Sequence, residues 1–359
     1  MAFGLPQVTL TFSAVARSLG NAAATGRLAM VLRDAAATEM ATLTFTNLAE
    51  AEAALAWSDA SKMAIQQAFL GSPAAVIIVV LPAEGVLANG YTALESLRFD
   101  VCTVAGLVEG EAAGFVSWAK DAYTNKGKRA LFVVAGTAAP DHQAIIHFDT
   151  SGIVVDGETH TAFDYLPRIA GALAGLQLWE SSTYLVLPEV QDCPHMTRTQ
   201  ANTAIAAGKL ILYHDGEKVK IARGVTSLTT IGQGQSTEFQ KIKVVRILNQ
   251  LEADIVSNVE DNYIGKIPNS FVQKSLLISA INDYLVSLES LSVLSAGENS
   301  VGIDLVRQRA YLKTKMPEAQ VDAMDDDAVR EAYTEDKLFL AGTVRPVDSV
   351  EDVTIAFTL

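Results

Sequence analysis

Short stretches near both ends of the chain alternate apolar and polar side chains. Near the start the apolar positions are Val8, Leu10 and Phe12. At the end they are Val353, Ile355, Phe357 and Leu359. A period of two, in residues with β-branched or aromatic side chains, predicts half-buried strands. The pattern alone favours strands within the protein's own sheets. The alternative is that each end adds a strand to the sheet of a neighbouring molecule.

Between residues 25 and 164, apolar runs alternate with amphipathic stretches. The runs predict strands at residues 27–34, 39–46, 75–81, 99–105, 130–135 and 144–148, and a hairpin at 152–161. The amphipathic stretches predict helices at residues 48–57, 60–70, 92–97 and 111–125. Strands interleaved with helices are typical of parallel βαβ units, so this region is predicted to be an α/β layer.

The second half of the chain has longer helical patterns and fewer strands. A helix rich in small residues begins near residue 165, and a hairpin is predicted at 209–223 with Asp215-Gly216 as its turn. Further helices are predicted at 237–259, 269–294, 303–315 and 328–333, and strands at 338–345 and 353–359. We therefore predict an α/β fold with α+β character in the C-terminal half. It comprises two domains and extended N- and C-terminal strand arms.

Composition narrows the classes of function. The chain has 359 residues, half of them apolar, and a formal net charge of −14, which argues against a general nucleic-acid binder. It lacks an apolar run of about 18 residues, so we expect no membrane insertion. The start lacks the charged and apolar regions of a secretory signal. Two cysteines, Cys102 and Cys193, cannot form a disulfide framework, and a reducing compartment fits them.

Motifs that carry chemistry are missing from the sequence. It contains no G-x-G-x-x-G or G-x-x-x-x-G-K-[ST] phosphate loop and no G-x-S-x-G elbow. Cys193 and His195 have metal-ligand side chains but lack a second ligand pair, and His142 and His147 do not have the H-E-x-x-H spacing. We therefore predict no catalytic residue, no cofactor and no metal site. An α/β enzyme of the cytosol with an unrecognised site is an alternative.

Several longer stretches form a distinctive set. They are MAFGLPQVTLTFSAVA, RIAGALAGLQLWESSTY, GKLILYHDGEKVKIARGVTSLTT, FQKIKVVRILNQLEADI and KLFLAGTVRPVDSVEDVTIAFTL. Together they resemble contractile-tail sheath proteins, the subunits of phage tails and of phage-derived bacteriocin particles. The resemblance runs from end to end, with its best landmarks between Arg168 and Leu359. In length the chain is similar to the small sheaths, which lack large surface insertions.

The resemblance implies a structural, non-enzymatic subunit. Such subunits stack as six-fold rings in a helical sheath around a tail tube, and the sheath contracts to drive the tube through a target envelope. The implied partners are further copies of the chain, the tail tube protein, and the baseplate and tail terminator proteins. The implied location is the cytoplasm of the bacterial host during assembly and then a virion or tail-like particle. A second alternative is an oligomeric scaffold that does not contract.

The resemblance also assigns roles to parts of the chain. Residues 1–24 and 342–359 would be strand arms that complete sheets in neighbouring subunits, 25–164 an outer α/β domain, and 165–341 the inner sheath domain. Hinges are predicted at residues 17–26 and 342–352. The basic helix at 303–315 is our candidate for the tube-facing surface through Arg307, Arg309, Lys313 and Lys315. The alternative is that these charges solvate an outer face or cap the helix.

Overall fold

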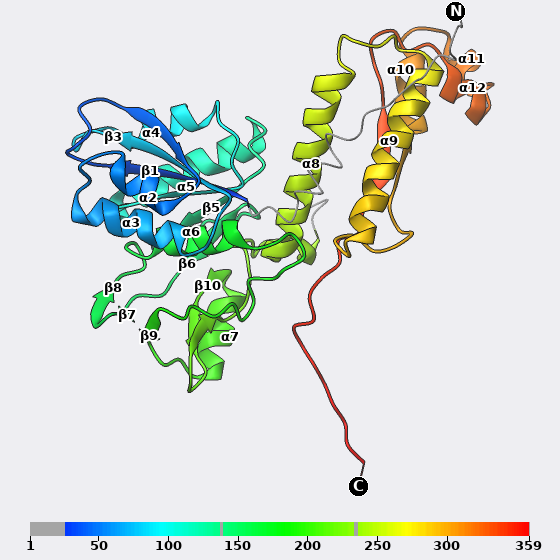
Figure 1. Ribbon diagram of the computed structural model, residues 1–359. Helices are drawn as coiled ribbons and strands as arrows, with labels where there is room; N and C mark the ends of the chain where they lie inside the picture. The colour runs from blue at the N-terminus through cyan, green and yellow to red at the C-terminus, as the bar shows by residue number, and fades with distance from the viewer. Residues whose placement is uncertain (1–25, 137–138, 233–235, 359) are drawn as a thin grey trace, which may run out of the picture. The chain divides into compact units, whose positions relative to one another are not determined.

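A computed structural model describes residues 26–136, 139–232 and 236–358 (Figure 1). The described residues form two compact units. The sheet unit runs up to Gln250 and takes in the chain again from Asp348, and the helical unit is Leu251–Val347. The N-terminal arm with Val8, Leu10 and Phe12, most of the hinge at 17–26, and Leu359 lie outside the described residues.

The sheet unit is built on a seven-stranded sheet. Only the edge strand β2 is antiparallel to its neighbour. In spatial order the strands are β10 (Lys209–Leu210), β6 (Ile145–Phe148), β5 (Leu131–Val134), β4 (Val101–Val104), β1 (Arg27–Arg33), β3 (Ala75–Leu81) and β2 (Ala41–Phe45). Every residue of β3 is buried, as expected for a parallel strand covered on both faces. The predicted α/β layer is confirmed.

Helices cover both faces of this sheet (Figure 1). Those that follow or precede its strands are α2 (Leu48–Ala53), α3 (Asp59–Phe69), α4 (Leu87–Leu94), α5 (Glu109–Thr124) and α6 (Leu166–Gly175). Helices α3 and α6 contact each other and one face, while α4 and α5 contact the other. Tyr91, Phe115, Trp118 and Phe132 interlock between α4, α5 and β5, with ring centroids 4.9–6.3 Å apart. These aromatic rings fill that side of the core.

Two small sheets, helix α7 (Arg198–Ala206) and the first residues of α8 (Ile242–Asn262) complete the sheet unit. The first sheet contains β7 (Ile153–Val155), β8 (Glu158–His160) and β9 (Val190–Asp192), and the second is the hairpin of β11 (Leu212–His214) and β12 (Val219–Ile221). Both predicted hairpins are confirmed. Asp215 Oδ1 accepts hydrogen bonds of 3.0 Å from the amides of Glu217 and Lys218, and Gly216 has a φ of 105°. This aspartate and glycine form the turn that their sequence predicted.

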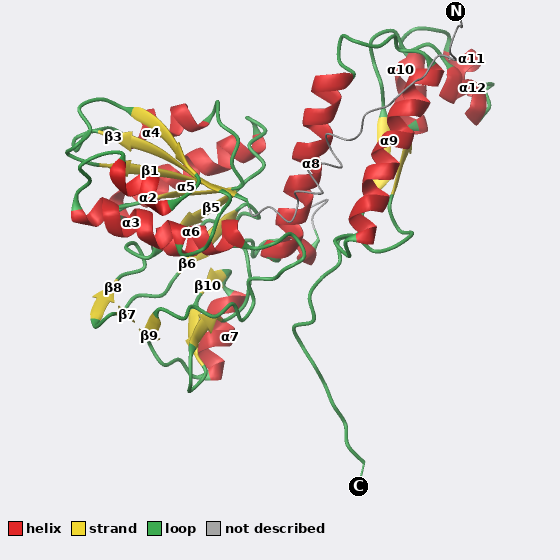
Figure 2. Ribbon diagram, viewed as in Figure 1, coloured by secondary structure: helices red, strands yellow, loops and turns green. Residues whose placement is uncertain are grey.

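The helical unit contains α9 (Phe271–Ser290) and the second half of α8, the two longest described helices (Figure 2). After the short turn η1 (Thr237–Gln240), α8 (Ile242–Asn262) crosses from one unit to the other. Next come α9 (Phe271–Ser290), β13 (Ser300–Ile303), α10 (Leu305–Lys313), α11 (Glu318–Asp322), α12 (Asp326–Glu331) and β14 (Leu340–Thr343), with β13 and β14 paired antiparallel. Leu312, Val321 and Val329 form a separate small core among α10, α11 and α12. No described helix combines the length and apolar character needed to cross a membrane.

Some predicted elements differ from the structure. Helix α4 begins at Leu87 rather than at residue 92, because Asn89-Gly90 resembles a turn in sequence but lies within the helix. Gly90 is needed there because a Cβ would lie 2.7 Å from Val31 Cγ1. Helix α10 begins two residues later than predicted, since Ser300–Ile303 pairs with β14. Helix α7 (Arg198–Ala206) was not predicted, although Thr197 and Gln200 form a capping box whose sequence marks its start.

The compact units do not follow the predicted division at residue 164. Helix α6 and the hairpin at 209–223 lie in the same unit as the sheet, because α6 contacts β1, β4 and β5. In the single chain, residues 351–358 adopt no regular structure, so the described part of the predicted strand at 353–359 is not paired within the subunit. A strand requires a partner edge for its hydrogen bonds, and no described segment pairs with this one.

Helices α3 and α6 approach each other so closely that backbone lies on backbone. A Cβ on Gly171 would be 2.2 Å from the carbonyl oxygen of Ala68, and one on Gly175 would be 1.5 Å from that of Gly71. No side chain can occupy such a gap without a shift of the helices. The small residues of this helix are therefore required for its packing on α3.

Replacement of Gly171 by alanine should destabilise the sheet unit by about 1–3 kcal/mol or more, because the added methyl group forces the two helices apart. Urea denaturation of the soluble subunit measures this loss. Gly114→Ala is the matched control: this exposed glycine within α5 has no atom within 4 Å of the added Cβ. It should be neutral or stabilise the fold by up to about 1 kcal/mol. Equal effects of the two substitutions would contradict the packing argument.

Candidate functional site: the C-terminal arm and its anchor

The C-terminal arm, residues 353–358, exposes its apolar side chains. Val353, Ile355 and Phe357 are between 68% and 88% exposed, and the residues between them are exposed too. These three large apolar residues lie at alternating positions in an extended segment that no element of the described chain covers (Figure 1). Exposed apolar residues of this size and spacing mark a surface that another chain can cover.

The arm begins at a charged residue that is firmly held. Glu351 Oε1 accepts hydrogen bonds from the hydroxyls of Thr183 (2.6 Å) and Ser181 (3.2 Å). Glu351 Oε2 accepts a hydrogen bond of 2.9 Å from Arg223 Nε. Only 11% of the Glu351 side chain is exposed. Its carboxylate is therefore fixed at three points at the root of the arm.

Two further contacts hold the segment just before Glu351. Lys241 Nζ forms an ion pair with Asp348, and Lys243 Nζ donates a hydrogen bond of 3.0 Å to Ser349 Oγ. Arg223 also reaches Asp352 through Nη2, at 2.8 Å. We call residues 348–352 with these partners the anchor.

The electrostatics of the anchor follow from partial burial. Burial, the largest single effect, favours the neutral form of Asp348, but the hydrogen bonds from Lys241 and the Ser349 amide and the charges of Lys241 and Lys243 together outweigh it and leave the pKa of Asp348 below its ordinary value. Burial lowers the pKa of Lys243, an effect that the charges of Asp348 and Glu351 oppose. The hydrogen bond to Asp352 raises the pKa of Arg223. The contacts thus bind and orient the chain, and hydrogen-bond donors engage both carboxylate oxygens of Glu351.

The partners of Glu351 come from two distant loops that the backbone joins. Tyr184 N donates to Ile221 O (2.8 Å), which attaches the Ser181–Tyr184 turn to β12. Gly224 N donates to Thr183 Oγ1 (2.9 Å), and a Cβ on Gly224 would lie 2.4 Å from Ser182 Oγ. The Arg-Gly-Val sequence therefore needs its glycine so that Arg223 and Thr183 can meet at one carboxylate.

The start of α8 is tied to the same place. Ile242 N donates to Gly224 O (3.0 Å), and Thr226 N donates to Gln240 O (2.8 Å). This short pairing brings Lys241 and Lys243 to the side of Arg223. Three segments that are far apart in sequence, near residues 182, 223 and 242, thus build one basic and hydroxyl-lined support.

The chain before the anchor is held within the helical unit. Arg345 N donates to Asn299 Oδ1 (2.7 Å) and Val347 N to Val293 O (2.9 Å), while Pro346 forms a bridge with Leu294. Contacts with the helical unit hold the first half of the predicted hinge at 342–352, and the anchor holds its second half. The boundary between the two units lies between them, at Val347 and Asp348. The hinge itself stays a prediction.

The basic helix α10 has partners within its own unit. Arg309 donates to the carbonyls of Val321 (3.2 Å) and Met324 (3.0 Å) and to Asp326 (2.8 Å). Lys313 pairs with Glu318 and Asp322, and Lys315 with Glu335. Arg307 is the most exposed, at 75%, and lies 3.4 Å from Asp304. Arg309 and Lys313 thus fasten α10 to α11 and the loop after it, a role that the bare sequence did not indicate.

The sequence did not predict the contacts of the anchor, among them those of Glu351 with Thr183 and Arg223. The available signal was a pair of acids, Glu351-Asp352, placed directly before the alternating segment. The arm residues Val353, Ile355 and Phe357 lie where they were predicted, but as an unpaired segment.

Comparisons with known proteins show which family this chain belongs to. The family model of the phage tail sheath protein central domain matches residues 82–227, and that of the phage tail sheath C-terminal domain matches residues 234–359. The tail sheath protein of Clostridium phage phiCD119 is 31% identical over 361 aligned positions that cover 98% of both chains. The chain belongs to the phage tail sheath family. Its predicted resemblance is confirmed.

Solved structures of sheath proteins share the fold. The sheath tail protein Lin1278 from Listeria innocua has a TM-score of 0.71 at 16% identity, with 94% of this chain and 96% of that chain covered. The contracted helical sheath of the anti-feeding prophage has a TM-score of 0.70 at 15% identity, with 93% of each chain covered. The anchor of this sheath-family chain draws on several of the stretches that carried the resemblance, among them ESSTY and ARGV.

Arg223→Ala should loosen the anchor, because the half-buried Glu351 loses its charged donor. A charge-assisted hydrogen bond contributes about 1.5–3 kcal/mol when buried, and partial exposure reduces this value. We therefore expect roughly tenfold faster cleavage after Glu351 by a glutamate-specific protease. Mass spectrometry detects this cleavage as loss of the last residues.

Arg345→Ala is the control for this experiment. Arg345 lies in the same part of the chain and pairs with Glu298, but both side chains are mostly exposed. Its removal should leave the rate at Glu351 unchanged. Equal rates in the wild-type and Arg223→Ala proteins would show that Arg223 does not hold the arm.

Proposed function

We propose that this chain is the structural subunit of a contractile tail sheath, polymerised helically around a tail tube. The observation that carries the proposal is the C-terminal arm, which leaves a fixed root and presents alternating, exposed apolar residues. The anti-feeding prophage protein with the same fold forms a helical sheath with a contracted state, which supports the same kind of polymer here. The role is structural rather than catalytic.

The arm is suited to pairing with a sheet of another copy. One strand face carries Val353, Ile355, Phe357 and Leu359, and the backbone groups of residues 353–358 have no strand partner within the described chain. Addition of an edge strand would bury the apolar face and satisfy those groups. The N-terminal arm with Val8, Leu10 and Phe12 would make the reciprocal link. A head-to-tail contact of this kind that does not close produces an open helical polymer.

The energetics favour assembly by many contacts at once. Burial contributes about 1.5–3 kcal/mol for each large apolar side chain of the arm. Ordering the backbone costs about 1–2 kcal/mol for each residue, and the arm has two residues for every buried side chain. For one arm alone, the free energy gained by burial therefore nearly equals the entropic cost of ordering the backbone. Subunits should remain soluble until a baseplate and tube present several neighbours together.

The remaining partners follow from the same proposal. The tail tube protein, the baseplate and the tail terminator would contact the sheath, which would form in the bacterial host cytoplasm and persist in a virion or tail-like particle. An oligomeric scaffold without contraction would form polymers of a single length and diameter. Negative-stain microscopy separates this alternative, because a contractile sheath produces an extended and a shorter, wider form.

Phe357→Asp should prevent polymerisation without a change in the melting temperature of the free subunit. The side chain is exposed in the subunit, whereas a charge would be buried in the added strand. Thermal unfolding and electron microscopy of particles formed with the tube protein measure the two effects. Thr358→Asp, with the same charge on the opposite face of the strand, should still assemble. Normal assembly of Phe357→Asp would refute the role of the arm.

Arg307→Glu tests the proposed tube-facing surface of the basic helix. Because Arg307 is exposed and has one distant partner, the variant should fold normally and sediment less with the tube protein. Arg309→Glu should instead lower the melting temperature, since the guanidinium group that binds two backbone carbonyls is lost. Undiminished association of Arg307→Glu with the tube would show that α10 does not face it.

A further inference from the structure

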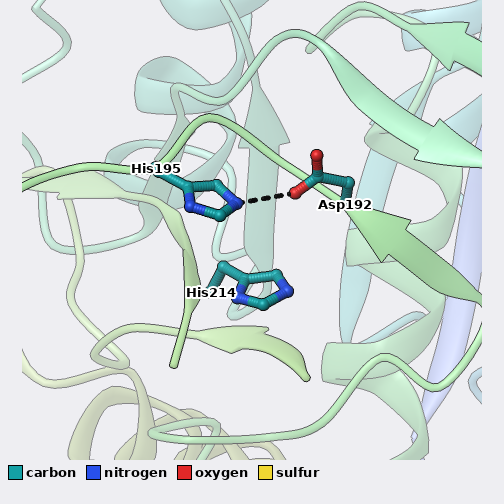
Figure 3. Close-up of side chains that lie close together, drawn as sticks. All are labelled: Asp192, His195 and His214. Carbon is teal, nitrogen blue, oxygen red and sulfur yellow. Dashed lines mark hydrogen bonds and ion pairs between the residues drawn. The ribbon is translucent and has the colours of Figure 1, made fainter. Parts of the chain in front are cut away.

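A cluster of two histidines and one aspartate lies in the sheet unit, outside the anchor. Asp192 ends β9, His195 lies three residues later, and His214 ends β11 (Figure 3). His195 Nε2 lies 2.9 Å from Asp192 Oδ1, and the rings of His195 and His214 stack with centroids 4.7 Å apart at an angle of 19°. One ligand atom from each residue lies within 4.8 Å of the other two.

The fold holds these residues from both sides. Leu187 N donates to Val219 O (3.0 Å), and Val186 forms a bridge with Lys220, so the segment leading to β9 is attached to the hairpin. Asp192 Oδ1 also accepts a hydrogen bond of 2.8 Å from Cys193 N. His214 Nδ1 accepts one of 3.0 Å from Gly216 N, in the hairpin turn. The backbone thus orients both the carboxylate and the second ring.

The ligands of the cluster suit a divalent cation that is intermediate between hard and soft, such as Zn²⁺. Imidazole nitrogens and a carboxylate oxygen are ligands of Zn²⁺ in three-ligand sites, where water fills the fourth position. Asp192 and His195 are exposed, so an ion and its water can reach them. The strongly negative chain also favours a cation over an anion. Cys193 is buried and lies outside the cluster.

We propose that Asp192, His195 and His214 bind a divalent transition-metal ion, with Zn²⁺ as the representative, and that this ion joins the loop after β9 to the β11–β12 hairpin. The ligand atoms of a tetrahedral zinc site lie roughly 3.3–3.5 Å apart at ordinary bond lengths, so atoms as far apart as 4.8 Å must close by about 1 Å, whereas His195 Nε2 and Asp192 Oδ1, at 2.9 Å, must separate slightly. His214 gives up the hydrogen bond from the Gly216 amide in either binding mode, because zinc at Nδ1 takes the accepting lone pair and zinc at Nε2 leaves the ring proton on Nδ1. The proposal goes beyond the assembly of a sheath, which does not require a metal.

The position of the cluster gives the ion a structural consequence. The hairpin that carries His214 continues through β12 to Arg223, which holds Glu351 at the root of the arm. A cross-link between β9 and the hairpin therefore stiffens the support of the anchor. We expect zinc to slow cleavage after Glu351 as well as to raise the melting temperature.

The test uses the full chain without a histidine tag, treated with a chelator and then dialysed. Isothermal titration with ZnCl₂ should show one ion per chain, and CoCl₂ should produce the visible absorption of a cobalt ion bound by nitrogen ligands. MgCl₂ should produce neither effect, since Mg²⁺ prefers sites made of oxygen ligands. His214→Gln, His195→Gln and Asp192→Asn should each weaken zinc binding at least tenfold and abolish the cobalt spectrum.

Glu217→Gln is the matched control, because it alters an exposed acid in the turn of the same hairpin without a change to the cluster. It should bind zinc as the wild-type chain does. Melting temperatures measured without metal confirm that each variant folds. If a variant does not fold, the cobalt spectrum of the wild-type chain decides the outcome. Zinc binding that the three variants leave unchanged, or a wild-type chain without a cobalt spectrum, would overturn the proposal. Either result leaves the sheath function intact, since polymerisation is measured separately.

Discussion

The carboxylate of Glu351 determines where the C-terminal arm departs from the sheet unit. Arg223, Thr183 and Ser181 hold its two oxygens, and Lys241 and Lys243 hold the residues just before it. An arm that is to pair with another molecule must combine a fixed origin with an unpaired strand, because a loose origin would lower the effective concentration of that strand at its target. The transition from held to free chain occurs within two residues, between Glu351 and Val353. In the proposed assembly, that sharp boundary lets residues 353–358 act as a connector between subunits.

The support behind Glu351 depends in turn on the close packing of the sheet unit. Helix α6 precedes the Ser181–Tyr184 turn in the chain. Its glycines let it pack directly on the backbone of α3 and of Gly71, and this close packing fixes where the turn begins. Arg246 of α8 donates to the carbonyls of Leu176 (2.6 Å) and Gln177 (3.4 Å) at the end of α6, and burial lowers the pKa of this arginine to about 10. The hairpin, the turn and the start of α8 are therefore fastened to the same helix. Packing and charge act together at this place, since the buried arginine satisfies two backbone carbonyls just past the end of α6.

The charges of the helical unit show the difference between composition and arrangement. The four basic residues of the predicted helix at 303–315 suggested a positively charged surface. In the structure, Arg309, Lys313 and Lys315 pair with acids and carbonyls of neighbouring segments. A short helix with a core of only three buried residues, Leu312, Val321 and Val329, needs such contacts. Arg307 alone among the four basic residues combines high exposure with a long ion-pair distance. The same acidic residues that lower the net charge thus hold the small helices together.

The sequence by itself determined the elements with strong local signals. Apolar runs located every strand of the main sheet except β10, which was predicted as part of the hairpin. The Asp215-Gly216 turn located the hairpin, and the longest stretches resembled the sheath family, which the comparisons confirmed. Only the tertiary structure decided which side chains meet. Glu351 and Arg223 are 128 positions apart, and His214 lies 19 positions from His195, so no local spacing could reveal either contact. It also decided the state of the last residues. A period of two specifies which face of a strand would be buried, but pairing requires the edge of another strand, and the described chain does not supply one.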